Sequence, residues 1–123
     1  MFGFLKKRRA IYGREVRDFL HDQLRIEIDA ERNSAFYGEW ALEDLIVKGF
    51  YHGVNSTHCA LIIGRHYLYE LLKKGTAATS EAKQLNTTID FKASIAASRG
   101  LISREVHREY EDELRRIRIE KFR

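Results

Sequence analysis

The sequence contains no proline and only one cysteine, Cys59, in 123 residues. A single thiol cannot form a disulfide within the chain, and it excludes a structural zinc site that takes two or more cysteine ligands from one chain. The lack of proline removes the strongest helix breaker, which leaves glycine as the main residue that interrupts helices. These absences favour a helical fold that is held together without covalent cross-links.

Long apolar runs are absent as well. The longest uncharged and largely apolar run covers residues 59–64, whereas a transmembrane helix needs about 18 apolar residues. Basic residues at positions 6–9 stand where a signal peptide would have its apolar region. We therefore expect a cytoplasmic protein, peripheral to the inner face of a membrane if its N-terminal segment contacts lipid.

The composition is typical of one small globular domain. Apolar residues make up 44% of the chain and charged residues 33%, and the mean hydropathy is −0.45. This is too apolar for a disordered chain and too polar for a membrane-embedded one. We expect a basic, phenylalanine-containing segment at residues 1–8 and a single helical domain at residues 9–123.

Apolar residues recur every three to four positions along most of the chain, which predicts amphipathic helices. The expected helices cover about residues 9–32, 34–51, 56–73, 80–98 and 101–123. The third is apolar on most sides, so we expect it at the centre of a bundle. Gly100 either separates the last two helices or lies within one long helix. The prediction is an all-α bundle of four to five helices with a long charged C-terminal helix.

A competing interpretation exists for two short segments. Residues 24–28 and 117–120 alternate between apolar and charged side chains, as a half-buried strand does. Both segments lie in longer runs of good helix formers without flanking turn residues. We therefore rank paired strands second.

The charge is concentrated at the two ends. Residues 1–17 carry a net charge of +5, residues 18–98 a net charge of −3, and residues 99–123 a net charge of +2. At the N-terminus, aromatic and aliphatic side chains stand beside four consecutive cations, a combination that binds anionic lipid surfaces. The residues expected to contact a membrane or another anion are Phe2, Phe4, Leu5, Lys6, Lys7, Arg8 and Arg9. The alternatives are a solvated basic terminus, or phenylalanines that fold back onto the core.

Two further groups of side chains suggest a protein partner. The first is an aromatic cluster that forms either a partner surface or part of an aromatic core. The second is an apolar stripe flanked by charges, which an intermolecular or an intramolecular helix pair would use. The predicted interface residues are Phe36, Tyr37, Trp40, Ile102, Val106, Tyr110, Leu114 and Ile117. We expect the partner to be a second copy of the chain.

Nucleic acid is the second choice of partner, because both ends are basic. Arg14 and His21 are separated by six residues, a spacing that occurs in small helical nucleases of the HEPN type. We treat this match of two residues as coincidence. The cations near the C-terminus follow a run of acids, so a solvated helix face with pairs such as Glu111–Arg115 is the simpler interpretation.

The sequence carries no nucleophile motif and no phosphate-binding loop, so we expect no catalytic residue, metal or cofactor. A metal-dependent enzyme that uses His66, Glu70 and Glu43 is a third and weaker hypothesis. It is weaker because such spacings of histidines and acids arise easily by chance. The leading prediction is a non-enzymatic helical interaction or adaptor protein that self-associates, with weak membrane contact through its N-terminus. The alternative is a nucleic-acid-binding or RNA-cleaving protein that uses its basic ends with Arg14 and His21.

Overall fold

The computed structural model describes residues 2–28 and 41–122, and every regular element in these ranges is helical. The prediction of an all-α bundle with a long charged C-terminal helix is confirmed. The elements are α1 (Phe2–Asp18), a π-helical turn (Phe19–Gln23), α2 (Leu42–Tyr51), α3 (Ser56–Lys73), a 3₁₀ turn (Gly75–Ala78), α4 (Thr79–Ser98) and α5 (Arg104–Lys121).

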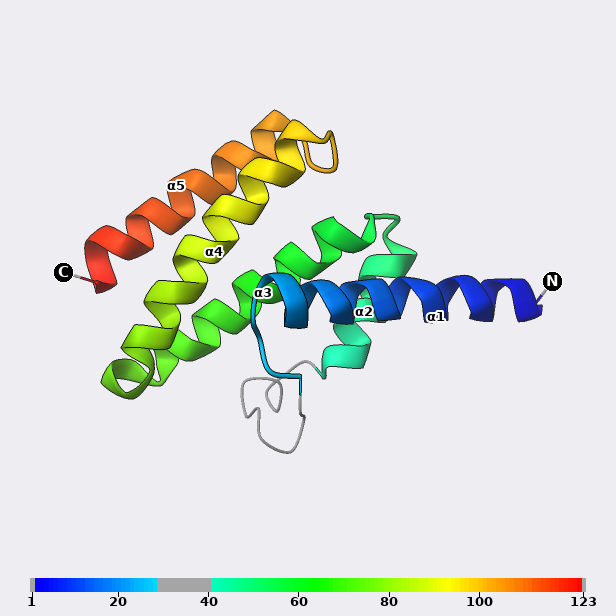
Figure 1. The fold of residues 1–123 in the computed structure, drawn as a ribbon, viewed down its shortest axis with the longest axis horizontal. Helices are drawn as coiled ribbons and strands as arrows, with labels where there is room; N and C mark the ends of the chain where they lie inside the picture. Colours follow the sequence, from blue (N-terminus) through cyan, green and yellow to red (C-terminus); the bar gives the residue numbers. More distant parts are fainter. Residues whose placement is uncertain (1, 29–40, 123) are drawn as a thin grey trace.

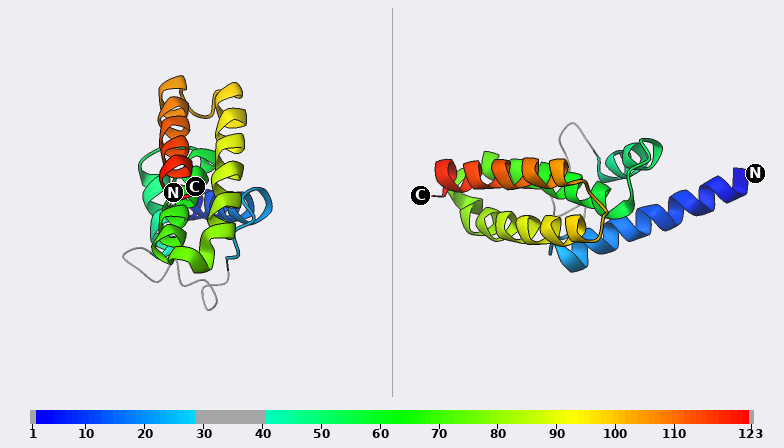
Figure 2. Two further views of the ribbon diagram at one scale, coloured as in Figure 1. Left: turned by 90° about the vertical axis from the view of Figure 1, so that its left-hand side faces the viewer. Right: turned by 90° about the horizontal axis from the view of Figure 1, so that it is seen from above.

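Helix α3 lies at the centre of the molecule (Figure 1). Helix α4 runs back along it, and α5 returns along α4, while α1 and α2 pack on the N-terminal half of α3. The first turns of α1 extend beyond the rest of the molecule, at the end opposite to the C-terminus (Figure 2). The molecule is thus a helical body from which one basic helix projects.

The boundaries of α3 follow from local sequence signals. The Asn55 side chain accepts a hydrogen bond from the backbone N–H of His58 at 2.8 Å and caps the first turn. Gly75 has a φ of +69°, the left-handed conformation that commonly ends a helix. Most sides of α3 are buried, as expected for a central helix, through Cys59, Ala60, Leu61, Ile63, Gly64, Tyr67, Leu68 and Leu71.

Gly100 separates α4 from α5. It has a φ of +74°, and the next residue, Leu101, donates its N–H to the carbonyl of Ala96 at 2.9 Å. This is the Schellman ending, in which a left-handed glycine lets the chain satisfy the last carbonyls of a helix. Ser103 then caps α5 by accepting from the N–H of Val106 at 3.1 Å. Residues 80–121 therefore form two helices.

The first helix differs from the prediction at both ends. It begins at Phe2 rather than near position 9, because residues 5–9 are all good helix formers. Its π-helical continuation ends at Gln23 rather than near position 32. Arg25 adopts a φ of +58°, which stops the helix and lets Leu24 and Ile26 both reach the core.

The alternating pattern at residues 24–28 therefore reflects the burial of Leu24 and Ile26 in an irregular segment, without strand pairing among the described residues. The second such pattern, at residues 117–120, lies within α5. Helix α2 begins at Leu42, and the earlier part of the helix expected from residue 34 lies outside the described residues.

A buried polar group joins α4 to α5. Asn86 is fully buried, donates from Nδ2 to the carbonyl of Leu114 at 3.2 Å, and accepts from the guanidinium of Arg118 at 2.9 Å. The same guanidinium lies 3.5 Å from a carboxylate oxygen of Asp90. Because a buried polar group is costly when unpaired, this network fixes the register of the two helices.

We predict that Asn86→Ala lowers the free energy of unfolding by about 2 kcal/mol, because it removes two hydrogen bonds and leaves Arg118 without one of its partners. Chemical denaturation measures the change. Lys83→Ala, at an exposed position on the same helix, is the control and should change stability by less than about 0.5 kcal/mol. Equal effects of the two substitutions would contradict the structural role of Asn86.

Gly49 marks the closest approach between α2 and its neighbours. A Cβ atom at this position would lie 2.4 Å from Sγ of Cys59 and 3.0 Å from the hydroxyl of Tyr12. Real Cβ atoms do not come so close to a neighbouring heavy atom, so only glycine lets α2 pack this tightly on α1 and α3. By contrast, a Cβ at Gly13 would meet Ile46 at an ordinary 3.5 Å.

We predict that Gly49→Ala destabilises the protein by about 1–3 kcal/mol through overpacking, although alanine is the better helix former. The Cys59→Ala background removes Sγ, the nearest of the atoms that the added methyl group would meet, so the double-mutant cycle should show an interaction of at least about 1 kcal/mol. Gly13→Ala is the matched control and should stabilise by about 0.5–1 kcal/mol. A stabilising Gly49→Ala would refute the close packing.

Candidate anion-binding surface on helix α1

Helix α1 places its cations where they weaken the helix. Its first turn contains no acidic residue, and Lys6, Lys7, Arg8 and Arg9 follow immediately. The N-terminal end of a helix carries a partial positive charge and favours acidic side chains. An arrangement that opposes local stability in this way is typical of a surface under functional selection.

The outer face of α1, defined here as Phe4, Lys7, Arg8 and Ile11, combines exposed apolar side chains with cations. These residues follow a spacing of three and four, which places them on one side of a helix. Phe4 is 63% exposed and Ile11 is 44% exposed. The guanidinium of Arg8 lies 5.5 Å from the centre of the Phe4 ring. Aromatic and basic groups therefore lie together on a surface that none of the described helices covers.

Side chains near the C-terminal half of α1 hold the helix on the body. Tyr12 donates its hydroxyl hydrogen to the carbonyl of Val54 at 2.9 Å, and its ring meets that of Phe50 edge to face at 5.3 Å. Burial raises the pKa of Tyr12 above its ordinary value, so the hydroxyl stays a donor. Ser56 adds a 2.7 Å hydrogen bond to Glu15. These contacts set the orientation in which α1 projects.

Helices α1 and α2 form a groove of about 530 Å³. Its lining residues are Lys6, Arg9, Ala10, Gly13, Arg14, Arg17, Asp18, Glu43, Ile46 and Val47. Lys6 and Arg9 also line a neighbouring pocket of about 290 Å³. The wall of that pocket is apolar, because it is completed by Leu5, Phe50 and Tyr51. A basic groove thus adjoins an apolar pocket along one helix pair.

The structure places the N-terminal residues expected to contact an anion as follows. Phe4, Lys7 and Arg8 lie on the outer face, whereas Leu5, Lys6 and Arg9 line the groove or the pocket. The side chain of Phe2 lies outside the described part of the chain. Sequence reasoning missed Ile11, Arg14 and Arg17 as members of this surface. Extending the helical period back to residue 2 would have placed Ile11 beside Phe4.

The apolar stripe of α5 is used inside the chain. Ile102, Tyr110, Leu114 and Ile117 are buried against the other helices, and Val106 is half-buried. A role for this stripe at a partner surface would require α5 to leave the bundle. The aromatic residues of the other predicted interface, Phe36, Tyr37 and Trp40, lie outside the described residues.

The residues of the nucleic-acid and metal hypotheses are dispersed. His21 bonds to its neighbour Asp22 at 2.9 Å, and Arg14 lines the groove. Glu70 pairs with Lys73 at 3.0 Å, and Glu43 pairs with Arg17. Within residues 2–28 and 41–122, no three His, Cys, Asp or Glu side chains form a group that could hold a metal ion.

The cations near the C-terminus are partly neutralised within the bundle. Arg115 pairs with Asp112 at 3.6 Å, and Arg118 takes part in the Asn86 network. The expected partner of Arg115, Glu111, pairs instead with His107 at 3.0 Å. Two of the cations on α5 are therefore engaged within the fold.

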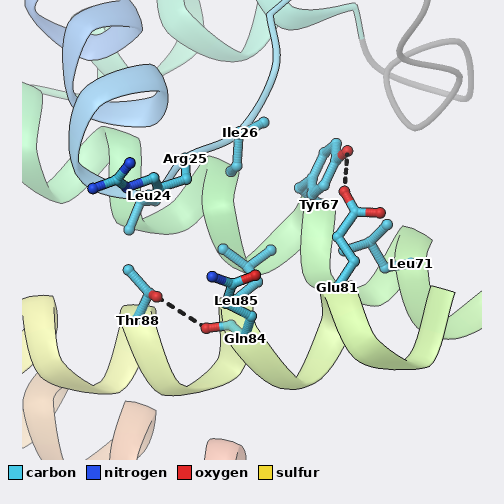
Figure 3. Close-up of a pocket in the computed structure, with 9 residues that line it drawn as sticks. All are labelled: Leu24, Arg25, Ile26, Tyr67, Leu71, Glu81, Gln84, Leu85 and Thr88. Atoms are coloured by element: carbon cyan, nitrogen blue, oxygen red, sulfur yellow. Dashed lines mark hydrogen bonds between the residues drawn. The ribbon is translucent and has the colours of Figure 1, made fainter.

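The pocket shown in Figure 3 has a volume of only about 40 Å³. Tyr67 donates to a carboxylate oxygen of Glu81 at 3.3 Å across it, while the side chain of Arg25 turns away (Figure 3). A ligand pocket usually measures about 300–1,000 Å³, so this space holds water at most. A fourth pocket, of about 320 Å³, lies near the π-helical turn, where Lys92 bonds to Gln23 at 2.7 Å.

A polar cluster joins α3 to α5. The guanidinium of Arg65 lies 4.7 Å from the centre of the Tyr110 ring, and its Nε is 3.7 Å from Glu113. The Tyr110 hydroxyl has no hydrogen-bond partner among the described residues, and burial raises its pKa to about 12. A phenol held protonated at neutral pH, with its oxygen sealed from solvent, is part of the packing rather than a general base.

The same environment affects His58. Burial, and then the charge of Arg65, lower the pKa of this histidine below its ordinary value. As the pH falls, the unfolded chain therefore takes up a proton on His58 before the folded protein does. Folding stability should decrease over the pH range in which the unfolded chain is protonated at His58 and the folded protein is not, because the unfolded state binds more protons.

We predict that His58→Gln reduces the loss of unfolding free energy between about pH 7 and about pH 5, since it removes one group whose folded pKa is depressed. Urea denaturation at both pH values measures this difference. His52→Gln, at an exposed position, should leave the loss unchanged. A steeper loss in His58→Gln than in the unmodified protein would contradict the sign of the shift.

No family model, curated protein or solved structure matches the chain. No helix among the described residues is long and apolar enough to cross a membrane.

Proposed function

We propose that this protein is a non-catalytic adaptor that docks on an anionic membrane surface through helix α1. The observation that carries the proposal is the outer face, where exposed Phe4 and Ile11 alternate with Lys7 and Arg8 on a helix that projects from the body. Apolar side chains enter the interfacial region of a bilayer, and the cations meet anionic headgroups. Two weak contributions of this kind together hold a protein on a surface.

The apolar side chains favour a membrane over nucleic acid as the partner. The phosphate backbone of a duplex is bound by cations and polar groups, and it offers no apolar region for the exposed Phe4 and Ile11 together. Lipid interfaces satisfy both groups at once. The C-terminal cations, the second part of the nucleic-acid hypothesis, support it less because Arg115 and Arg118 have acidic partners within the fold.

The rest of the fold suits an adaptor. The bundle of α3, α4 and α5 joins its helices through the buried Asn86 and covers the apolar stripe that leads into α5. It therefore provides a stable body that α1 attaches to a surface. Self-association stays a prediction, and it would have to use surfaces other than the buried α5 stripe.

We predict that Phe4→Ser combined with Ile11→Ser, and separately Lys7→Glu combined with Arg8→Glu, release the protein from vesicles that contain phosphatidylserine. Each unit of positive charge lost should weaken binding about fivefold, from about 1 kcal/mol per charge, and each reversal to glutamate removes two units. Loss of the Phe4 ring, which the bilayer would bury, should weaken vesicle binding about tenfold or more. Flotation at low and moderate salt measures the bound fraction.

The chain offers a close control for these substitutions. Phe91 is 62% exposed and lies beside the ammonium of Lys92, 5.7 Å from the ring centre, as Phe4 lies beside Arg8. Phe91→Ser should leave vesicle binding unchanged. Equal losses in Phe91→Ser and in the α1 variants, or binding to RNA but not to anionic vesicles, would overturn the proposed function.

A further inference from the structure

The groove between α1 and α2 is a second charged surface on the docking helix, distinct from the outer face. It presents four cations and two carboxylates, a net charge of +2. Arg17 is already paired with Glu43. The remaining cations are Lys6, Arg9 and Arg14, and Asp18 is the other carboxylate. The groove contains no histidine, so its own charge is constant around neutral pH.

The free cations are spaced along the groove at Lys6, Arg9 and Arg14. Lys6 and Arg14 form no ion pair with any residue in the described ranges. Arg9 uses one nitrogen in a long contact, 3.4 Å, with the hydroxyl of Tyr51, and its other donors are available. Three cations that line one groove, without acidic partners among the described residues, favour a multiply charged anion with several acceptor oxygens.

Two small residues, Ala10 and Gly13, line the groove and leave space in it. Packing does not require glycine here, since a Cβ at Gly13 would meet Ile46 at an ordinary distance of 3.5 Å. Alanine would also be the better helix former. The absence of a side chain at this position therefore leaves space in the groove without improving the fold.

The apolar pocket of Leu5, Phe50 and Tyr51 continues from the groove and shares Lys6 and Arg9 with it. A ligand that spans both must carry charge at one end and apolar groups at the other. This combination distinguishes a lipid from a free phosphate ion or a polar phosphate ester.

We propose that the groove binds the phosphomonoester headgroup of an anionic lipid, with the adjoining part of the lipid in the apolar pocket. A phosphomonoester carries a charge of about −1.5 to −2 at neutral pH and three acceptor oxygens, which complements the net charge of the groove. A phosphodiester headgroup carries one negative charge on its phosphate and matches it less well. The inference rests on the proposed docking of α1, which brings the groove to the lipid surface. Calorimetry with a soluble lipid distinguishes failure of the groove from failure of the docking.

The test compares vesicles that contain phosphatidate with vesicles that contain phosphatidylserine at the same surface charge. The full chain should bind phosphatidate more tightly, by about fivefold for each cation engaged. The preference should decrease as the pH falls through about 6, where the phosphomonoester loses its second charge. Phosphatidylserine binding should change little over the same range.

Two groove variants and one outer-face variant test where the preference resides. Arg9→Gln with Arg14→Gln removes two free cations, and Ala10→Leu fills the groove without changing its charge. Both should abolish the preference for phosphatidate while retaining binding to phosphatidylserine. Lys7→Gln with Arg8→Gln should weaken binding to both lipids by the same factor. Thermal unfolding confirms that each variant is folded.

Soluble dihexanoyl phosphatidate, titrated into the full chain by calorimetry, separates this inference from the docking proposal. Binding that is lost in Ala10→Leu supports the groove even if vesicle docking fails. Equal binding of the unmodified chain to both vesicle types, or an unchanged preference in both groove variants, would overturn it. Tight binding of inorganic phosphate alone, blocked by Ala10→Leu, would also overturn the lipid assignment.

Discussion

The close contact at Gly49 determines where α1 lies. Because no side chain separates α2 from Cys59 and Tyr12 at this point, the two helices can pack together on α3. The Tyr12 hydroxyl then reaches the carbonyl of Val54 across the α2–α3 connection. The groove between α1 and α2, and the direction in which the outer face points, both follow from this joint. A larger residue at position 49 would alter the candidate site without touching any of its cations.

The rest of the fold is largely self-sufficient. Asn86 and Arg118 pair across α4 and α5, and Asn55 links the α2–α3 connection to the α4–α5 turn through the carbonyl of Leu101 at 2.8 Å. The apolar stripe of α5, which an intermolecular helix pair could have used, is buried within the chain. Helix α1 differs in its charge order, which opposes its own dipole, and it also exposes Phe4, Leu5 and Ile11.

Local signals explain which parts of the fold were predictable. Asn55 and Ser103 cap their helices, and Gly75 and Gly100 end helices in the left-handed conformation, so the limits of α3 and α5 could be derived from neighbouring residues. The end of the first helix depends on Arg25, a residue type that rarely adopts a positive φ. Only the tertiary demand that Leu24 and Ile26 both be buried selects that conformation, and no local pattern reveals it.

The candidate site was only half predictable for a related reason. The cations at positions 6–9 are evident in the sequence. A run of cations next to phenylalanine, however, occurs both in irregular termini and in helices, so the sequence does not distinguish the two. Once α1 is helical, its period divides the run, placing Lys7 and Arg8 with Phe4 and turning Lys6 and Arg9 toward α2. The groove is completed by Glu43 and Ile46 of α2, which are distant from α1 in the chain. They lie beside α1 only because Gly49 allows α2 to pack closely. One basic segment thereby acquires two surfaces of different chemistry, a mixed apolar and basic face for the bilayer and a charged groove for a single headgroup.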